Sequence, residues 1–354
     1  MRPRAEVVVT GGAGFVGASL ALGLAERHPD WQIRAFDNLK RRGSELALTR
    51  LARRGVRFVH GDVRNVADVR DLGRFDLLID CAAEPSVLAD SPSYVLDTNL
   101  NGTLHCLEAA RTHDAGFVFL STSRVYPITR LTQVPRIEQS TRFAIAPHAS
   151  GAGLSAHGIA EDFPLAGARS LYGASKLASE LIIEEYAAAY GLRAVIDRCG
   201  VLAGPWQMGK VDQGVIVHWV ASHVFQRPLR YIGWGGSGKQ LRDVLHVQDL
   251  IRLVDSQITV LDQLHADVFN VGGGATGSLS LYELTELCQM ATGQRVELGS
   301  EPETRRADIP LYVSDARLAS QRFDWAPQHA PAQIVEDIAR WIHDERAALE
   351  RIFT

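Results

Sequence analysis

The sequence lacks the features of a membrane or nucleic-acid-binding protein. No apolar run approaches the about 18 residues that a membrane span needs, and the chain enters its first apolar strand without the apolar core of a secretory signal. Its basic clusters are short, Lys40-Arg41-Arg42 and Arg305-Arg306, and the formal net charge is −4. We therefore expect a cytoplasmic protein whose basic clusters contact phosphates or solvent, with no nucleic-acid or membrane partner.

Patterned cysteines and histidines are also missing. The four cysteines show no C-x-x-C spacing, and two lie in apolar strand or turn segments, so buried free thiols are expected rather than disulfides. These are Cys81, Cys106, Cys199 and Cys288. None of the twelve histidines has metal-ligand spacing, since His218 and His223 are too far apart to share one helix face well. No metal is expected.

The overall composition is that of an ordinary globular protein, with 46% hydrophobic and 22% charged residues in 354. Strand and helix patterns alternate to about residue 200, which predicts an α/β fold with a doubly wound parallel sheet. Residues 201–245 and 276–354 are more irregular and predict a smaller lobe. The segment 127–169 is rich in proline and glycine, and we interpret it as a flap that contains a short hairpin.

A glycine-rich turn follows the first predicted strand, residues 6–9. Gly11, Gly14 and Gly17 have G-x-x-G-x-x-G spacing and lead into an apolar helix. Glycine lets the backbone approach a pyrophosphate, and a helix N-terminus offers N–H groups to it. A tight turn without a ligand is the alternative interpretation.

Acidic residues follow the second and third predicted strands. Asp37 lies about 20 residues after the last glycine, where a carboxylate accepts hydrogen bonds from an adenosine ribose and repels a 2′-phosphate. This favours NAD over NADP, although Lys40-Arg41-Arg42 could accept a phosphate. Asp62-Val63 follows the strand predicted at 56–59 and is placed to meet the adenine, with a plain loop as the alternative.

Two later strands end in small or hydroxyl residues. The strand at 77–80 runs into Ala82-Ala83, and the strand at 117–120 ends in Ser121-Thr122-Ser123. Because ligands of open parallel sheets lie beyond the carboxyl ends of the strands, we expect five residues to face one crevice. They are Gly11, Asp37, Asp62, Ala82 and Thr122.

Tyr172 and Lys176 are one helical turn apart in Tyr-Gly-Ala-Ser-Lys. On a helix their side chains share a face. A free tyrosine titrates at about 10, and a nearby positive charge favours its phenolate. Tyr172 is thus a candidate base for a sugar or alcohol hydroxyl. The alternative is that Tyr172 and Lys176 are ordinary polar residues on the surface of a helix.

Taken in order, these motifs resemble an extended short-chain dehydrogenase/reductase of the NAD-dependent epimerase/dehydratase family. The later segments 238–250, 269–272 and 325–327 agree with it. The resemblance implies a Rossmann domain over 1–200 and 246–275 and a nucleotide-sugar-binding lobe over 201–245 and 276–354. It implies NAD bound by Gly11, Gly14, Phe15, Val16, Asp37, Asn38, Asp62, Val63, Ala82, Ala83, Asn99, Tyr172 and Lys176.

The same resemblance implies the roles at the reacting centre. Tyr172 corresponds to the base, Lys176 to its partner and Thr122 to a hydrogen-bond partner of the reacting hydroxyl. Arg242 and Arg305 correspond to arginines that grip a diphosphate, with Arg306 as the alternative to Arg305. The implied substrate contacts are Ser123, Arg124, Gln213, Arg242, Arg305 and Asp308.

Three segments resemble the CDP-paratose (CDP-tyvelose) 2-epimerase subgroup: 36–43, 210–214 and 242–246. Dehydratases of the superfamily place an Asp-Glu pair directly after the threonine, and Ser123-Arg124 stands there instead, which can supply neither acid nor base. We therefore expect a nucleotide-sugar epimerase that acts by transient oxidation, at C2 of a CDP-hexose. A UDP-hexose 4-epimerase, a nucleotide-sugar reductase or dehydrogenase, and a non-catalytic NAD-binding regulator remain the alternatives.

Two predicted helices carry apolar stripes. One stripe contains Leu100, Leu104, Leu107 and Ala110, and the other contains Leu181, Ile182, Tyr186 and Ala189. Either stripe could face the sheet. In relatives these helices pair across a two-fold axis, so the resemblance implies a homodimer.

Overall fold

The computed structural model describes residues 5–86, 91–209 and 213–353. Contacts divide the chain into two compact units. The first comprises Met1–Val125, Leu171–Arg198 and Leu250–Phe269, and the second comprises Tyr126–Ser170, Cys199–Asp249 and Asn270–Thr354. The segment 127–169, which the sequence boundaries assign to the nucleotide-binding domain, is therefore grouped by its contacts with the second unit.

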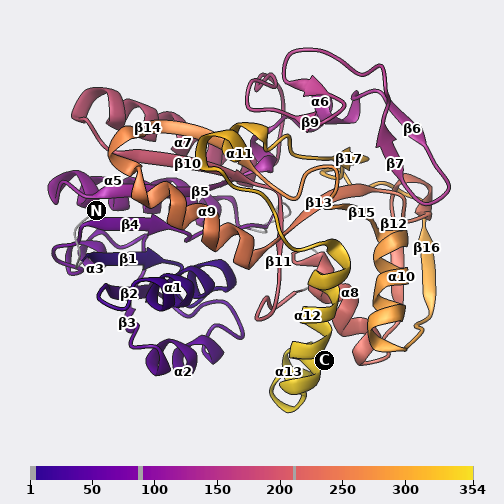
Figure 1. The fold of residues 1–354 in the computed structure, drawn as a ribbon, viewed down its shortest axis with the longest axis horizontal. Coiled ribbons are helices and arrows are strands. Elements are labelled where there is room, and N and C mark those ends of the chain that lie inside the picture. The colour runs from indigo at the N-terminus through magenta and orange to yellow at the C-terminus, as the bar shows by residue number, and fades with distance from the viewer. Residues whose placement is uncertain (1–4, 87–90, 210–212, 354) are drawn as a thin grey trace. The chain divides into compact units, whose positions relative to one another are not determined.

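The first unit is built on a seven-stranded sheet with the order β14-β10-β5-β4-β1-β2-β3 (Figure 1). Strand β1 pairs in parallel with β2 and β4, and the β2–β3 and β4–β5 pairs are parallel too. The predicted α/β fold class with a parallel, doubly wound sheet is confirmed. The strands are β1 (Glu6–Thr10), β2 (Gln32–Asp37), β3 (Arg57–His60), β4 (Leu77–Asp80), β5 (Gly116–Thr122), β10 (Ala194–Cys199) and β14 (His265–Val271).

The central strands are apolar in their middle parts because helices cover both faces of a parallel sheet. Val7, Val8 and Val9 of β1 are fully buried, as are Phe117 and Phe119 of β5. The helical segments connecting these strands are α1 (Phe15–Arg27), α2 (Leu46–Arg53), α3 (Val66–Arg70), α4 (Pro92–Leu96), η1 (Asp97–Asn101), α5 (Gly102–Thr112), η2 (Ser123–Val125), α7 (Leu171–Tyr190), α9 (Val247–Thr259) and η4 (Leu261–Gln263).

The carboxyl ends of the parallel strands position the predicted site. Thr10, Asp37, Asp80 and Thr122 are the last residues of β1, β2, β4 and β5. Because these strands run parallel, the four side chains lie at one edge of the sheet. Helix α7 packs against β5 and the following turn η2, which brings the segment that begins at Leu171 to the same edge.

The second unit combines small sheets with helices. Strand β13 (Leu241–His246) pairs with β11 (Val201–Ala203), β15 (Ser278–Ser280) and β17 (Leu311–Tyr312), and β12 (Leu229–Ile232) pairs with β16 (Leu298–Glu301). The helical segments are α6 (Ile128–Thr132), α8 (Val215–Val224), η3 (Trp234–Gly236), α10 (Leu281–Thr292), α11 (Arg317–Phe323), α12 (Pro331–Asp344) and α13 (Arg346–Phe353).

The long segment before α7 forms two antiparallel hairpins, as the sequence suggested for one. They are β6 (Arg136–Glu138) with β7 (Phe143–Ile145), and β8 (Leu154–Ser155) with β9 (Gly158–Ile159). Arg142 anchors the first hairpin, since its Nε lies 2.7 Å from Oε1 of Glu283 and its Nη2 lies 2.5 Å from Oε2. Glu283 also completes the capping box that starts α10 with Ser280.

The predicted stripe on α7 is divided: Ile182 and Tyr186 pack against the core of the first unit, whereas Leu181 and Ala189 are exposed. Leu181 is 55% exposed, whereas Ile183 is fully buried in the core of the first unit. In the other predicted stripe, Leu107 and Ala110 of α5 are buried. Throughout the described ranges, every helix is too short or too polar to cross a bilayer.

Candidate functional site

The glycine turn after β1 is packed too closely for side chains. Gly11 has a φ of +60°, and a Cβ added there would lie 2.9 Å from the carbonyl oxygen of Cys81. A Cβ at Gly17 would lie 2.2 Å from the carbonyl oxygen of Gly11. Gly14 is the N-cap of α1, and no described side chain caps the helix, so the N-terminal N–H groups remain for a ligand. This turn fits the pyrophosphate of a dinucleotide, with Phe15 and Val16 as the first two residues of the helix.

Asp37 ties the end of β2 to this turn. Its Oδ2 accepts a hydrogen bond from the N–H of Ala13 at 3.1 Å, and its Oδ1 accepts one from Leu39 at 2.7 Å. Burial raises the pKa of Asp37, and these backbone N–H groups oppose the rise. A carboxylate offers about four acceptor positions, so acceptor capacity remains for ribose hydroxyls. The residue fits the adenosine half of NAD.

Asp62 lies against Asn38, and both residues were predicted to contact the cofactor. The Nδ2 of Asn38 donates to Oδ2 of Asp62 at 2.8 Å. Arg64 binds the same carboxylate with two nitrogens, at 2.9 and 2.6 Å, and this pair is the main reason that the pKa of Asp62 lies well below its ordinary value. Neither Arg64 nor the ring of Tyr94, which lies 3.1 Å from Nζ of Lys40, was identified from the sequence.

The turn after β4 is held by hydroxyl groups. Thr10 donates to Asp80 at 2.6 Å, and its oxygen accepts the N–H groups of Cys81 and Ala82, each at 3.1 Å. This arrangement keeps Ala82 and Ala83 beside the glycine turn, where small side chains leave room for a cofactor. Val63, also predicted to contact the cofactor, is buried, and a Cβ added at Gly102 would lie 2.7 Å from its Cγ2.

Asn99 links this turn to helix α7. It is fully buried, its Oδ1 accepts from the N–H of Glu84 at 2.7 Å, and its Nδ2 donates to Oγ of Ser175 at 3.0 Å. Ser175 precedes Lys176 directly. The side chain of Asn99 therefore joins the cofactor edge of the sheet to α7.

The three predicted catalytic residues all belong to the first unit. Thr122 ends β5, while Tyr172 and Lys176 lie one turn apart in the first part of α7. Thr122 is 7% exposed, and its Oγ1 accepts the N–H of Arg124 at 3.2 Å, so its hydroxyl proton can be donated to a substrate oxygen. Lys176 is almost entirely buried. Ser123 and Arg124 form the turn η2 that follows.

A buried ion pair, which was not predicted from the sequence, holds α7 in place one turn beyond these residues. Glu180 lies one turn after Lys176, and Arg198 of β10 contacts its Oε2 through Nε at 3.1 Å and Nη2 at 2.7 Å. The hydroxyl of Ser121, next to Thr122, donates to Oε1 of Glu180. The network ties the helix of Tyr172 to the strand of Thr122.

The predicted substrate residues lie in the second unit, apart from the turn η2. Arg242 of β13 pairs with Asp308 at 2.9 Å and also donates to the carbonyl of Ile309 at 2.8 Å. Burial lowers the pKa of Arg242. Arg305 is exposed, and its carbonyl accepts the N–H of Asp308 at 3.0 Å. Gln213 is partly buried before α8, and the preceding residues 210–212 of the predicted segment lie outside the described residues.

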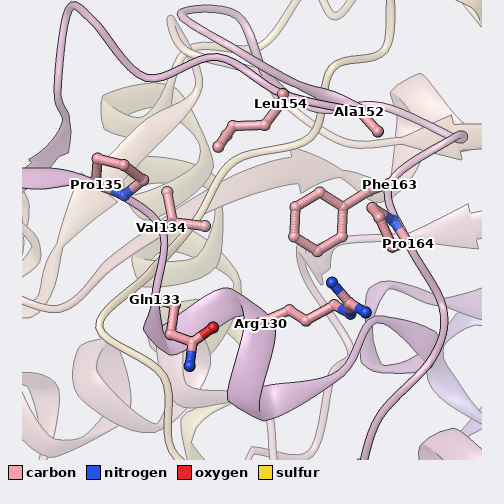
Figure 2. Close-up of a pocket in the computed structure, with 9 residues that line it drawn as sticks. Arg130, Gln133, Val134, Pro135, Ala152, Leu154, Phe163 and Pro164 are labelled. Atoms are coloured by element: carbon pink, nitrogen blue, oxygen red, sulfur yellow. The ribbon is translucent and has the colours of Figure 1, made fainter.

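A separate hollow of about 210 Å³ lies on the second unit between α6 and the second hairpin. Figure 2 shows Val134, Leu154 and Phe163 facing a shared space, with Arg130 along its edge. None of the predicted cofactor or substrate residues is among the described residues that line it. In the described part of the chain, no group of three or more His, Cys, Asp and Glu side chains is placed to hold a metal ion.

Comparisons with known proteins agree with this geometry. The CDP-paratose 2-epimerase of Salmonella typhi is 31% identical over 352 residues, covering 95% of this chain and 98% of that protein. A dTDP-glucose 4,6-dehydratase of Mycolicibacterium smegmatis is 29% identical, covering 92% of this chain and 88% of its own. The structure of Pal from Bacillus thuringiensis matches with a TM-score of 0.78 and 25% identity, covering 96% of this chain and 99% of that chain.

The fold is also that of the UDP-glucuronic acid 4-epimerase from Bacillus cereus, whose structure matches with a TM-score of 0.77 at 21% identity over 96% of this chain and 99% of that chain. The model of the NAD dependent epimerase/dehydratase family matches residues 7–272. The glycine turn and Asp37 fit the cofactor in that description. The chain therefore belongs to the NAD-dependent epimerase/dehydratase family, and its cofactor is NAD.

Proposed function

We propose that this enzyme is a nucleotide-sugar epimerase that inverts C2 of a CDP-hexose. The observation that carries the proposal is the turn η2, where Ser123 and Arg124 follow Thr122. Neither side chain can act as the acid or the base of a dehydration at neutral pH. The similarity to the Salmonella typhi CDP-paratose 2-epimerase over 95% of the chain supports the choice of C2 and of CDP.

In this proposal Tyr172 removes the proton from the hydroxyl at C2, and Lys176 favours the phenolate form that accepts it. Thr122 donates its hydroxyl proton to the same substrate oxygen. Bound NAD would supply reversible hydride acceptance, which converts the carbinol to a keto sugar and back. Tyr172 then returns the proton to the oxygen after the ring has presented its opposite face.

The second unit is proposed to hold the nucleotide. Arg242 and Arg305 grip the diphosphate, because the planar guanidinium meets phosphate oxygens with two parallel hydrogen bonds. Asp308 orients Arg242 through the ion pair at 2.9 Å. A diphosphate that stays bound while the sugar turns prevents loss of the keto intermediate. We accordingly assign NAD to the first unit and the sugar nucleotide to the second.

The test is a panel of CDP- and UDP-sugars incubated with the purified enzyme, without added cofactor, and read by proton NMR. A 2-epimer of a CDP-sugar is the expected product. Inversion at C4 of a UDP-hexose would replace the proposal with a 4-epimerase, conversion only with added cofactor would indicate a reductase or dehydrogenase, and no conversion would favour a regulator.

The variant Tyr172→Phe tests the role of Tyr172 as the general base. Loss of a general base typically costs 10²–10⁴-fold in rate, and bound NAD should remain, since the cofactor turn is intact. Tyr190→Phe is the matched control, because Tyr190 lies on the same helix and is 62% exposed. A Tyr172→Phe variant with the rate of the control would refute the assignment.

We also propose a homodimer formed through α5 and α7. The exposure of Leu181 at 55% leaves an apolar side chain on the outside of α7, and Ala189 of the same stripe is exposed as well. Burying such residues in a helical interface removes apolar area from water. Sedimentation at micromolar concentration should give a dimer for the parent and a monomer for Leu181→Arg, whereas a monomeric parent would contradict the proposal.

A further inference from the structure

The catalytic lysine lies on an aromatic ring. Nζ of Lys176 is 3.8 Å from the centroid of the Phe119 ring, in β5. Phe119 is fully buried and Lys176 is 1% exposed. Lysine is almost never buried to this extent unless its charge is stabilised. A ring face carries negative charge density and attracts an ammonium group, most strongly where water is absent.

The strand presents two successive contacts to the same helix. Phe119 and Ser121 point to one face of β5, because side chains alternate along a strand. Phe119 contacts Lys176, and Ser121 donates to Glu180 one turn later. The strand that ends in Thr122 therefore also sets the direction of the lysine side chain.

The charged groups around the lysine are held by other partners. From β4, Asp80 accepts the hydroxyls of Thr10 at 2.6 Å and Thr103 at 2.8 Å. On α7, the carboxylate of Glu180 is bound by Arg198 of β10. Cys81 follows Asp80, and burial raises the pKa of its thiol, so it is neutral at working pH. Tyr172 lies one turn before the lysine on the same helix.

We propose that Phe119 is a positioning residue for the reaction: its ring holds the Lys176 ammonium group and keeps it charged, and that charge in turn keeps the Tyr172 phenolate accessible near neutral pH. This rests on the proposed function, because it takes Tyr172 as the base. Phe119 itself touches neither substrate nor cofactor in this assignment. Without the ring, the ammonium loses both its stabilising face and its fixed direction.

The experiment is an ultraviolet titration of tyrosinate in the NAD-loaded enzyme without substrate. Phe119→Leu is compared with the parent, and each spectrum is corrected by subtracting the same protein carrying Tyr172→Phe. The subtraction cancels the other tyrosines, and two of them titrate late in addition, because burial raises the pKa of Tyr186 to about 12 and raises that of Tyr231 as well. The expected result is an upward shift of the Tyr172 midpoint by about one pH unit, the size that a buried cation–π contact allows.

Phe117→Leu is the matched control. Phe117 is also fully buried, lies on the same face of β5, and stacks with Phe119 at a centroid distance of 6.5 Å. Phe117→Leu removes the same volume from the core and leaves the Phe119 ring in place under the lysine, so its Tyr172 midpoint should stay within about 0.3 of the parent, given the small effect of neutral changes on charge. Phe119→Met, whose unbranched and flexible side chain adapts to an irregular gap, gives the same readout if Phe119→Leu does not fold.

Equal midpoints in the parent and both Phe119 variants would overturn the proposal, as would an equal shift in Phe117→Leu. Because no substrate is present, these outcomes are independent of whether the enzyme epimerises a CDP-sugar. A shifted midpoint together with no turnover on any nucleotide sugar would retain the role of Phe119 and overturn the proposed function instead.

Discussion

The ion pair between Glu180 and Arg198 should dominate the response of the first unit to mutation. Glu180→Gln keeps the shape of the side chain and its ability to accept the hydrogen bond from Ser121, but it removes the charge opposite Arg198. The side chains of Glu180 and Arg198 are only 1% and 5% exposed. Removing one partner of a buried pair typically costs about 3–5 kcal/mol, because the remaining charge loses its counter-charge in a medium of low polarity.

This cost translates into a melting-temperature shift. Unfolding entropy is about 2.1 cal/mol/K per residue. For the 354 residues of the chain this gives about 0.7 kcal/mol/K, so we expect a decrease of about 4–7 °C. The decrease is larger if the first unit unfolds on its own, since fewer residues then contribute entropy.

The assay is a thermal unfolding scan at the same saturating NAD concentration for every variant, because bound cofactor stabilises the folded state. Glu185→Gln is the control on an exposed position of α7, with an expected effect within about 0.5 kcal/mol. The double variant Glu180→Met with Arg198→Met should recover most of the loss, because it removes both buried charges. A single variant that melts within 1 °C of the parent, taken as roughly the scale of an ordinary surface change, would refute the reasoning.

Two further predictions concern the first unit. Burial raises the pKa of Asp197 to about 7, above its value in the unfolded chain. Between about pH 4 and pH 7 the folded state therefore keeps a proton that the unfolded state releases, and the free energy of unfolding falls as the pH rises through this range. Asp197→Asn should remove this part of the pH dependence of the unfolding free energy and stabilise the protein above pH 7 by an amount on the order of 4 kcal/mol. The measurement is denaturant unfolding from pH 5 to 8, and an unchanged pH dependence would contradict the prediction. Gly17→Ala should lower the NAD content of the purified protein at least about tenfold, because its Cβ would lie 2.2 Å from the Gly11 carbonyl oxygen, whereas Gly151→Ala, with no atom within 4 Å, should retain NAD. Equal NAD contents in these two glycine variants would be evidence against a role of the turn.

Features that depend on local spacing were predictable from the sequence. The glycine turn, Asp37 and the end of β5 each follow a strand, and parallel strands place their carboxyl ends together. Tyr172 and Lys176 are one turn apart, so their shared face follows from helix geometry alone. The α/β fold class required only the alternation of strand and helix patterns.

Contacts between residues that are distant in sequence were not predictable in this way. Arg142 reaches Glu283 across 141 positions, and nothing near either residue signals the pairing. From the sequence alone, Glu180 is one of several polar residues on a helix, and only the packing of α7 on β5 and β10 shows that it is buried. The buried face of α7 was still harder to predict, because Leu181 and Ile183 are both apolar and only the packing decides which one faces the core.

The double attachment of Asp37 has a consequence for engineering. This carboxylate holds the Ala13 N–H of the glycine turn as well as the Leu39 N–H of the loop after β2. Replacing it to admit a 2′-phosphorylated dinucleotide would loosen both segments at once. A redesign of coenzyme preference would therefore have to supply a new acceptor for those two amides before any arginine is added.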